Sequence, residues 1–123
     1  MKVLIADDEL RLRKVVALHL KKSGFDVIEA SNGKMAVELA QKNIPDVVVL
    51  DVMMPELNGL ETLKIMKSTK DLQDKPVIML SAKASKEDIE MGINLGASRY
   101  LTKPFSPKQL LDAILSFSRD INN

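Results

Sequence analysis

The sequence predicts a doubly wound α/β fold, in which a five-stranded parallel sheet lies between two layers of helices. First, short apolar segments with the composition of strands alternate with helical segments along all 123 residues. Second, residues 47–50 and 76–80 are almost unbroken apolar runs, which is typical of strands buried on both faces of a parallel sheet. Third, polar or charged residues follow the ends of several strands, and open α/β sheets bind their ligands at that edge.

The first part of the chain contains two strands and two helices. Residues 3–6 are wholly apolar, whereas residues 25–30 alternate in part between polar and apolar, which suits a strand at the edge of the sheet. The helix between them should end at Gly24, because glycine readily takes the left-handed conformation that follows a helix. Its apolar residues are Leu12, Val15, Val16 and Leu20. The second helix follows a turn at residues 31–33, ends near Asn43 and has apolar residues at Met35, Val37, Leu39 and Ala40.

The middle of the chain contains the third and fourth strands. Residues 47–50 are four consecutive apolar residues that lead directly to Asp51, and residues 76–80 lead in the same way to Ser81. Pro55 and the pair Asn58-Gly59 predict a loop after Asp51, since proline disfavours helix at the preceding residue and Asn-Gly favours a turn. The third helix then has apolar residues at Leu60, Leu63, Ile65 and Met66.

The last part of the chain contains two helices on either side of a fifth strand at residues 98–102. Ser85 caps a helix that has acidic residues in its first turn and stops at Gly96, and Gly92 indicates close packing there. The apolar residues of this helix are Ile89 and Ile93. Ser106 and Pro107 are the cap and the first residue of the final helix. Its apolar stripe is Leu110, Ile114, Phe117 and Ile121.

Length and composition predict one domain, residues 1–123, around a single core. The 18 basic and 17 acidic residues give a net charge of +1, so no long-range field draws the chain to nucleic acid or to an anionic membrane. The absence of cysteine excludes disulfides and thiolate-bound zinc. No segment has the apolar length of a secretory signal or a membrane span. We therefore expect a cytoplasmic protein that does not bind nucleic acid or membrane directly.

Acidic, hydroxyl and basic side chains gather at the predicted strand ends. Asp7 and Asp8 follow the first strand, Asp51 the third, Ser81 the fourth and Lys103 the fifth. Three carboxylates at close range stay ionised only with a cation between them, and oxygen ligands without histidine or cysteine favour Mg2+. An acyl phosphate on Asp51 would be matched by Mg2+, Lys103 and Ser81, since phosphoryl transfer chiefly requires positioning and charge neutralisation.

Each of these residues has an ordinary structural interpretation when it is taken alone. Acidic pairs after strands commonly cap helices, and lysines are mostly solvated. Their joint position at four strand ends favours a shared site. His19 is the only histidine and is interpreted as a packing or surface residue. The basic residues of the first helix are typical of a solvated face, with docking of an acidic partner as the alternative: Arg11, Arg13, Lys14, Lys21 and Lys22.

Four motifs carry a resemblance to a known family. They are Ile5-Ala6-Asp7-Asp8-Glu9, Leu50-Asp51-Val52-Met53-Met54-Pro55 with Asn58-Gly59, Leu80-Ser81-Ala82, and Tyr100-Leu101-Thr102-Lys103-Pro104-Phe105. Over essentially its whole length the chain resembles a response-regulator receiver domain of two-component signalling, and it is similar to the single-domain chemotaxis-type regulators. The resemblance implies a flavodoxin-like sandwich with the strand order 2-1-3-4-5.

The resemblance also implies how the acidic residues act. Asp51 would accept a phosphoryl group from a phosphohistidine on a sensor histidine kinase or a phosphotransfer protein. Mg2+ would bind Asp8, Asp51 and the backbone carbonyl of Met53, while Asp7 would act mostly through water. The chain would then be a signalling domain and not an enzyme with external substrates.

A second group of residues would turn phosphorylation into a change of surface. Lys103 would bind a phosphoryl oxygen, and Ser81 would move toward the phosphoryl group while Tyr100 turns inward. The surface of the fourth helix, fifth strand and fifth helix would then engage a downstream effector protein. The resemblance further implies a cis bond between Lys103 and Pro104, and a monomer or a phosphorylation-dependent dimer.

Three alternative functions fit parts of this pattern. A nucleotide- or flavin-binding domain would carry a glycine- or hydroxyl-rich loop where this chain has Asp7-Asp8-Glu9, which repels phosphate unless Mg2+ intervenes. A magnesium-dependent phosphatase of the haloacid-dehalogenase type would need a cap domain and an acid at the position of Met53. A receiver cut from a DNA-binding transcription factor commonly has an arginine where this chain has Ala113. That departure, with a chain end soon after the last helix, favours a stand-alone regulator.

Overall fold

Strands and helices alternate along the chain in the order that the sequence predicts. The structure is a computed structural model that describes residues 1–83 and 85–121, and for residues 118–121 only the backbone. The strands are β1 Lys2–Ala6, β2 Asp26–Ala30, β3 Val47–Asp51, β4 Val77–Ser81 and β5 Arg99–Thr102. The helices are α1 Leu10–Lys22, α2 Gly33–Asn43, α3 Gly59–Lys67, α4 Lys86–Asn94 and α5 Pro107–Ile121.

The five strands form one parallel sheet in the order β2-β1-β3-β4-β5, which confirms the predicted fold class and strand order. In this register Ala6 of β1 pairs with Leu50 of β3, and Asp51 pairs with Leu80 of β4. The residues that follow β1, β3 and β4 therefore come to the same edge of the sheet. β3 and β4 are buried at every position, whereas β2 at one edge is partly exposed, as its alternating sequence predicts.

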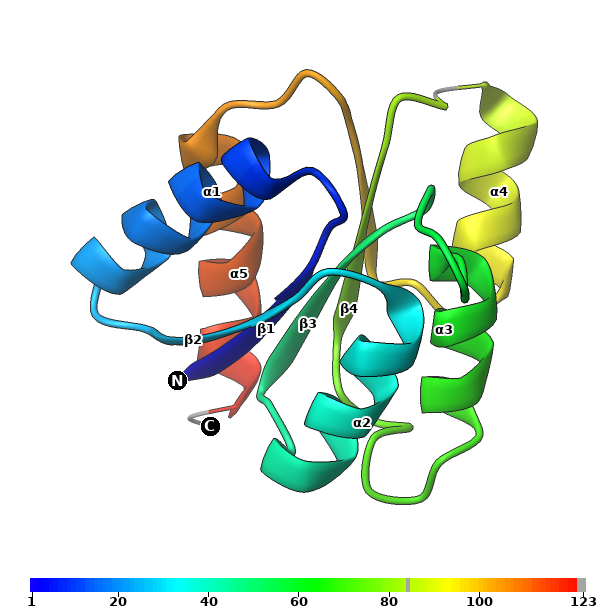
Figure 1. Ribbon diagram of the computed structural model, residues 1–123, viewed down its shortest axis with the longest axis horizontal. Helices are drawn as coiled ribbons and strands as arrows, with labels where there is room; N and C mark the ends of the chain where they lie inside the picture. Colours follow the sequence, from blue (N-terminus) through cyan, green and yellow to red (C-terminus); the bar gives the residue numbers. More distant parts are fainter. Residues whose placement is uncertain (84, 122–123) are drawn as a thin grey trace.

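Helices cover both faces of the sheet (Figure 1). Helices α1 and α5 lie on one face, and α2, α3 and α4 lie on the other. Because successive strand residues point to opposite faces, β1 sends Ile5 toward α1 and α5 and Leu4 toward α2 and α3. This arrangement gives two apolar layers and leaves the carboxyl edge of the sheet open between the loops.

The predicted helix ends are confirmed. Gly24 and Gly96 follow their helices with φ angles of +94° and +113°, which are left-handed values that favour glycine. Helices α1 and α4 end at Lys22 and Asn94, in each case two residues before the glycine. Helix α2 ends at Asn43 as predicted, but the next residue, Ile44, takes a φ of +45° although it is β-branched. The cis bond between Lys103 and Pro104 is as predicted.

Several apolar residues that mark the helices in the sequence lie at the surface. Val15, Met35, Ile65 and Ile93 are between 37% and 49% exposed, because they sit at the margin of the apolar stripe of each helix, beyond the edge that packs on the sheet. His19 is exposed, in agreement with a surface role. The side chain of Ile121 lies outside the described residues. Among the described residues no helix is long and apolar enough to cross a membrane.

Candidate functional site

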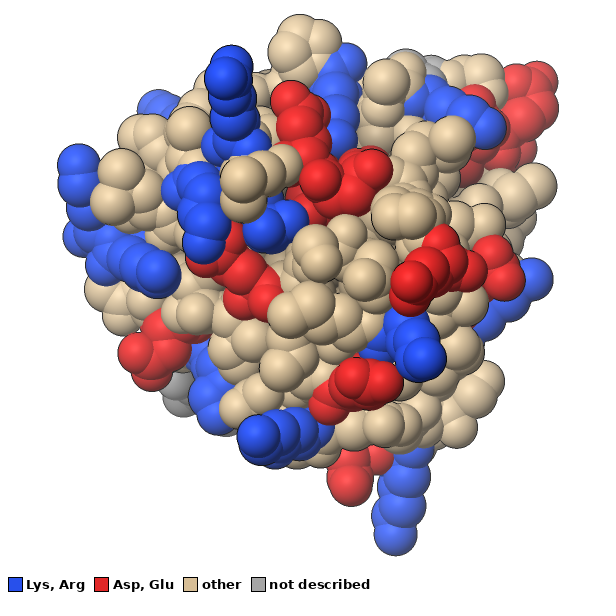
Figure 2. Space-filling model, in the orientation of Figure 1, with Lys and Arg blue, Asp and Glu red and all other residues tan. Residues whose placement is uncertain are grey.

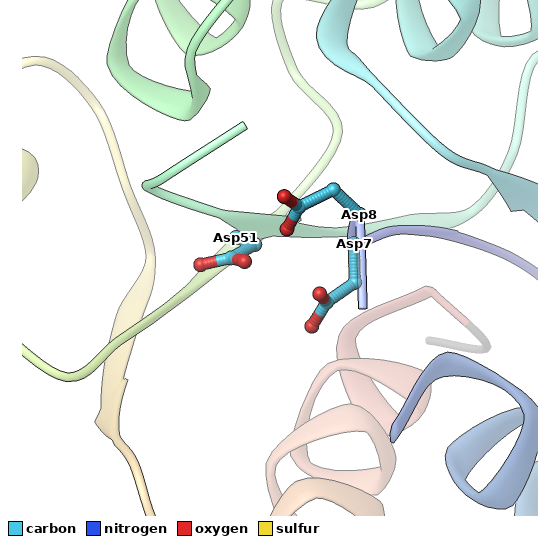
Figure 3. A group of neighbouring side chains, drawn as sticks. All are labelled: Asp7, Asp8 and Asp51. Atoms are coloured by element: carbon cyan, nitrogen blue, oxygen red, sulfur yellow. The ribbon is translucent and has the colours of Figure 1, made fainter. Parts of the chain in front are cut away.

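Three carboxylates converge at the carboxyl edge of the sheet. Asp7 and Asp8 follow β1, and Asp51 ends β3, the neighbouring strand. One oxygen of each carboxylate lies within 4.8 Å of the others, and Figure 3 shows the side chains grouped around a common space. Asp7 is fully buried and Asp51 is 4% exposed, whereas Asp8 is exposed. The structure therefore brings together the acidic residues that the sequence singles out.

Lys103 provides the positive charge next to the two buried acids. Its Nζ lies 3.2 Å from Oδ2 of Asp51 and 3.3 Å from Oδ2 of Asp7. The backbone N–H of Lys103 donates to the carbonyl oxygen of Ser81 at 2.8 Å, which holds the lysine at this edge of the sheet. Burial alone would lower the pKa of Lys103, but the carboxylates of Asp51 and Asp7 raise it above its usual value. The ammonium group is therefore charged and shared between two acids.

One ammonium group does not balance the acidic cluster. Burial, followed by the negative charge of Asp7, raises the pKa of Asp51 to about 6, although Lys103 and the backbone N–H of Met53 act in the opposite direction. That N–H donates to Oδ1 of Asp51 at 3.3 Å. The raised pKa means that the site favours a further positive charge, either a proton or a cation.

The donor set fits Mg2+. The acids offer hard carboxylate oxygens, and no histidine or cysteine belongs to the group. Both buried acids are already engaged: Lys103 and the N–H of Glu9 contact Asp7, while Lys103 and the N–H of Met53 contact Asp51. Direct binding by Asp8 and Asp51 with an indirect part for Asp7 therefore stays a prediction, as does the part of the Met53 carbonyl oxygen.

Ser81 and Tyr100 are joined through one residue of the β4–α4 loop. Ser81 is fully buried at the end of β4, and its Oγ accepts a hydrogen bond from the N–H of Lys83 at 2.9 Å. The Tyr100 hydroxyl donates to the carbonyl oxygen of Lys83 at 2.8 Å. On the α4 side, the ring of Tyr100 lies against Gly92. The two residues predicted to act as a switch therefore bind opposite sides of the same short backbone segment.

The sequence analysis missed Arg13 as a neighbour of the site. It placed Arg13 among the basic residues of a solvated face, and for this residue that interpretation is wrong. The Arg13 side chain is only 11% exposed, pairs with Glu29 of β2 and donates to the carbonyl oxygen of Asp7. An arginine one turn into the helix that follows an acidic loop was the available signal, but its direction depends on how α1 packs beside β2.

Comparisons with known proteins agree with this geometry. The family model for the response regulator receiver domain matches residues 3–115. The alkaline phosphatase synthesis transcriptional regulatory protein PhoP of Bacillus subtilis is 42% identical over 109 residues, which are 89% of this chain and 45% of that protein. The phosphate regulon transcriptional regulatory protein PhoB of Klebsiella pneumoniae is 37% identical over 98% of this chain and 53% of its own length. The chain thus spans about half the length of these curated relatives.

Solved structures show the same similarity over whole chains. The receiver domain of the Francisella response regulator 1452 superposes with a TM-score of 0.92 at 37% identity, covering 98% of each chain. The chemotaxis response regulator CheY4 of Vibrio cholerae superposes with a TM-score of 0.89 at 35% identity, covering 94% of this chain and 96% of that one. Both the fold and the sequence of the chain are therefore similar to those of these regulators.

Proposed function

Because the chain belongs to the response regulator receiver domain family, we propose that Asp51 is the residue that accepts its controlling phosphoryl group from the phosphohistidine of a partner kinase or phosphotransfer protein. The observation that carries this proposal is the place of Lys103, whose ammonium group lies within 3.3 Å of two buried carboxylates at the open edge of the sheet. Of these two acids, Asp51 is 4% exposed whereas Asp7 is fully buried, so Asp51 is the one that a phosphodonor can reach. As a response regulator the chain is a signalling protein.

The transfer forms one bond and breaks one bond. A carboxylate oxygen of Asp51 attacks phosphorus, the bond from phosphorus to the imidazole nitrogen of the donor breaks, and the histidine leaves with its electron pair. Mg2+, bound by Asp8, Asp51 and the Met53 carbonyl, would supply charge neutralisation at the phosphoryl oxygens. Lys103 then exchanges its contact with Asp51 for a phosphoryl oxygen.

Ser81 and Tyr100 transmit the change to the surface. The Ser81 hydroxyl has a proton to donate, and it turns toward the phosphoryl group when it gives up the N–H of Lys83. The Lys83 backbone segment then shifts, and with it the hydroxyl of Tyr100 that it binds. Because Tyr100 lies against α4, the surface of α4, β5 and α5 changes and engages an effector protein.

The basic side of α1 is the proposed docking surface for the phosphodonor. Figure 2 shows lysine and arginine side chains gathered over the α1 side of the molecule. Four of them are exposed: Arg11, Lys14, Lys21 and Lys22. At the N-terminal end of α1, next to Lys103, lies a hollow of about 390 Å³ lined by Glu9 and by four apolar residues: Leu12, Ala82, Pro104 and Phe105. Charge reversal at Lys21 and Lys22 should slow phosphotransfer from an acidic donor, and unchanged rates would contradict this surface.

Labelling with acetyl phosphate and Mg2+ tests the acceptor directly. We expect Asp51→Asn to lose incorporation of the phosphoryl group, while Asp26→Asn, at the opposite end of the sheet, labels like the parent chain. Asp8→Ala should bind Mg2+ much more weakly, and unchanged affinity would remove Asp8 from the site. Addition of beryllofluoride should shift the amide signals of Ser81 and Tyr100. Continued labelling of Asp51→Asn would overturn the proposal.

The names of the curated relatives support a second candidate, in which this receiver forms part of a transcriptional regulator. In that case the α4-β5-α5 surface pairs two receivers on phosphorylation, whereas a stand-alone regulator stays monomeric and binds a separate effector. Sedimentation of the chain with and without beryllofluoride distinguishes the two.

Release of phosphate from an added phosphoester over many turnovers would instead favour a magnesium-dependent phosphatase.

A further inference from the structure

The guanidinium group of Arg13 binds the backbone next to the acidic cluster. Its Nη1 donates to the carbonyl oxygen of Asp7 at 2.7 Å, and its Nε donates to Oε1 of Glu29 at 3.1 Å. The Arg13 side chain is 11% exposed, so water competes little for either bond. A buried arginine that uses two of its donors in this way holds a fixed orientation.

The carbonyl oxygen that Arg13 binds belongs to the peptide bond between Asp7 and Asp8. A peptide unit is planar, so fixing this carbonyl also fixes the direction in which the chain enters Asp8. The rest of Asp7 is held separately: its N–H donates to Ala30 at 3.1 Å, and its two carboxylate oxygens accept from Glu9 and Lys103. By contrast, the Asp8 carboxylate makes no hydrogen bond or ion pair within the described residues. The place of Asp8 depends on its backbone.

Glu29 holds the guanidinium group in this position, and Lys14 contacts only the other oxygen of the same carboxylate. Oε1 of Glu29 accepts from Arg13, and Oε2 accepts from Nζ of Lys14 at 3.0 Å. Burial alone would raise the pKa of Glu29, but its hydrogen bonds to Lys14 and Arg13 keep it below the usual value, so the carboxylate stays ionised. Lys14 is 61% exposed and does not reach Asp7. Within the described residues, Arg13 is the one member of this charged group that contacts the acidic loop.

We infer that Arg13, aligned by Glu29, is a positioning residue that holds the Asp7–Asp8 peptide so that the Asp8 carboxylate faces a divalent cation bound with Asp51. This inference rests on the proposed Mg2+ site and adds a residue to which that proposal gives no part. Arg13 does not touch the cation or the phosphoryl group, and it acts through the backbone of Asp7.

A positioning role and a purely electrostatic role of Arg13 predict opposite changes in Mg2+ affinity for the same variant. Arg13 is a positive charge near a cation site, so its charge alone opposes Mg2+ binding, and Arg13→Met would then tighten binding. If Arg13 positions Asp8, the same variant weakens binding. Arg13→Lys keeps the positive charge but lacks the planar guanidinium group that binds Asp7 and Glu29 together. It should therefore weaken Mg2+ binding only if the orientation of the Asp7–Asp8 peptide matters. Glu29→Gln keeps an acceptor for Nε and loses the charge that aligns the arginine.

Mg2+ titration of the full chain, followed by amide chemical shifts, measures the effect. We expect about tenfold weaker affinity for Arg13→Met and a several-fold loss for Arg13→Lys and Glu29→Gln, as for other residues that orient metal ligands. Lys14→Met is the matched control, since it removes one positive charge beside Glu29 and leaves the Asp7 contact intact. It should bind Mg2+ as tightly as the parent chain or slightly more tightly. Parental or tighter binding by Arg13→Met, or full rescue by lysine, overturns the inference.

Labelling as a function of Mg2+ concentration separates positioning from loss of structure. The Arg13 variants should need more Mg2+ for half-maximal labelling by acetyl phosphate yet reach the parental rate at saturation, because Asp51 and Lys103 are untouched. A lower rate at saturating Mg2+ with unchanged half-maximal concentration would overturn the inference. If Arg13→Met does not fold, Arg13→Lys decides it, because that variant keeps the net charge. Labelling of Asp51→Asn would instead count against the proposed function alone, since Mg2+ affinity does not depend on which residue is phosphorylated.

Discussion

Helices α3 and α4 are alike in length but not in how they are held. Each has nine residues, each begins with a side-chain cap, and each follows a strand that ends at the acidic site. Helix α3 buries four residues: Gly59, Thr62, Leu63 and Met66. Helix α4 buries one, Gly92. Both helices lie on the same face of the sheet (Figure 1), but α3 packs on the central strand β3 whereas α4 packs on the edge strand β5.

The contact partners explain what this difference means. A Cβ atom at Gly59 would lie 2.2 Å from the carbonyl oxygen of Asp51, so α3 packs directly on the backbone of Asp51. A Cβ atom at Gly92 would lie 3.0 Å from the ring of Tyr100, so α4 packs on a side chain. The hydroxyl of that side chain is held by one hydrogen bond to Lys83. A change at the site can therefore displace α4 while α3 stays in place.

The largest effect should come from Gly59→Ala. The added methyl group would overlap the backbone of Asp51, which cannot move without disturbing β3. We expect a loss of about 3 kcal/mol in the free energy of unfolding, measured with urea. Lys64→Ala, on the exposed side of the same helix, is the control and should cost less than about 0.5 kcal/mol. A small effect of Gly59→Ala would mean that α3 is no more firmly held than α4.

In metal-free buffer, Asp51→Asn should raise the free energy of unfolding. A carboxyl group whose pKa rises from about 3.9 in the unfolded chain to about 6 in the folded protein favours folding below that range, and this contribution is lost as the pH rises through 6. At pH 7.5 the ionised acid costs stability, so the amide variant should be about 1–3 kcal/mol more stable. The advantage should shrink at pH 5. Asp26→Asn should change stability little at either pH, and a pH-independent gain at Asp51 would contradict the electrostatic cause.

Tyr100→Phe tests the single hydrogen bond that holds the aromatic ring. Loss of the hydroxyl should cost about 1 kcal/mol or less, because the bond to Lys83 lies near the surface. Hydrogen exchange should become faster for the amides of α4 and stay unchanged for those of α3. Ser116→Ala removes a comparable hydroxyl-to-carbonyl bond within α5 and should leave α4 unaffected. Equal acceleration in both helices would contradict the separate anchoring of α4.

Gly92→Ala should have the smallest effect on stability. Alanine favours helix by about 1 kcal/mol over glycine, and displacement of the Tyr100 ring offsets that gain. The change should appear in the ring signals and fluorescence of Tyr100, which is the only tyrosine in a chain without tryptophan. Asn94→Ala, on the exposed side of α4, supplies the control for helix propensity. Tyr100 signals like those of the parent chain in Gly92→Ala would show that α4 does not pack on the ring.

Much of the site could be predicted because its residues stand at strand ends. The apolar run of residues 47–50 and its parallel neighbours predict that Asp7, Asp51 and Lys103 share one edge. The structure places the Lys103 ammonium group within 3.3 Å of a carboxylate oxygen of each acid. Arg13 could not be predicted in the same way. Its partners are the carbonyl of Asp7 and Glu29, sixteen residues away, and a basic helix face by itself does not reveal which arginine turns inward.

The sequence by itself determined the alternation of strands and helices, the parallel sheet and the acids at its edge. Apolar periodicity and turn residues are local patterns, and each segment shows them without reference to the rest of the chain. Only the tertiary structure decided that Arg13 binds the Asp7–Asp8 peptide and that α4 packs through Gly92 on Tyr100. These contacts join segments whose distance depends on strand register and on the packing of helices against the sheet. A side chain's partner across such an interface follows from the whole fold and not from the residues beside it.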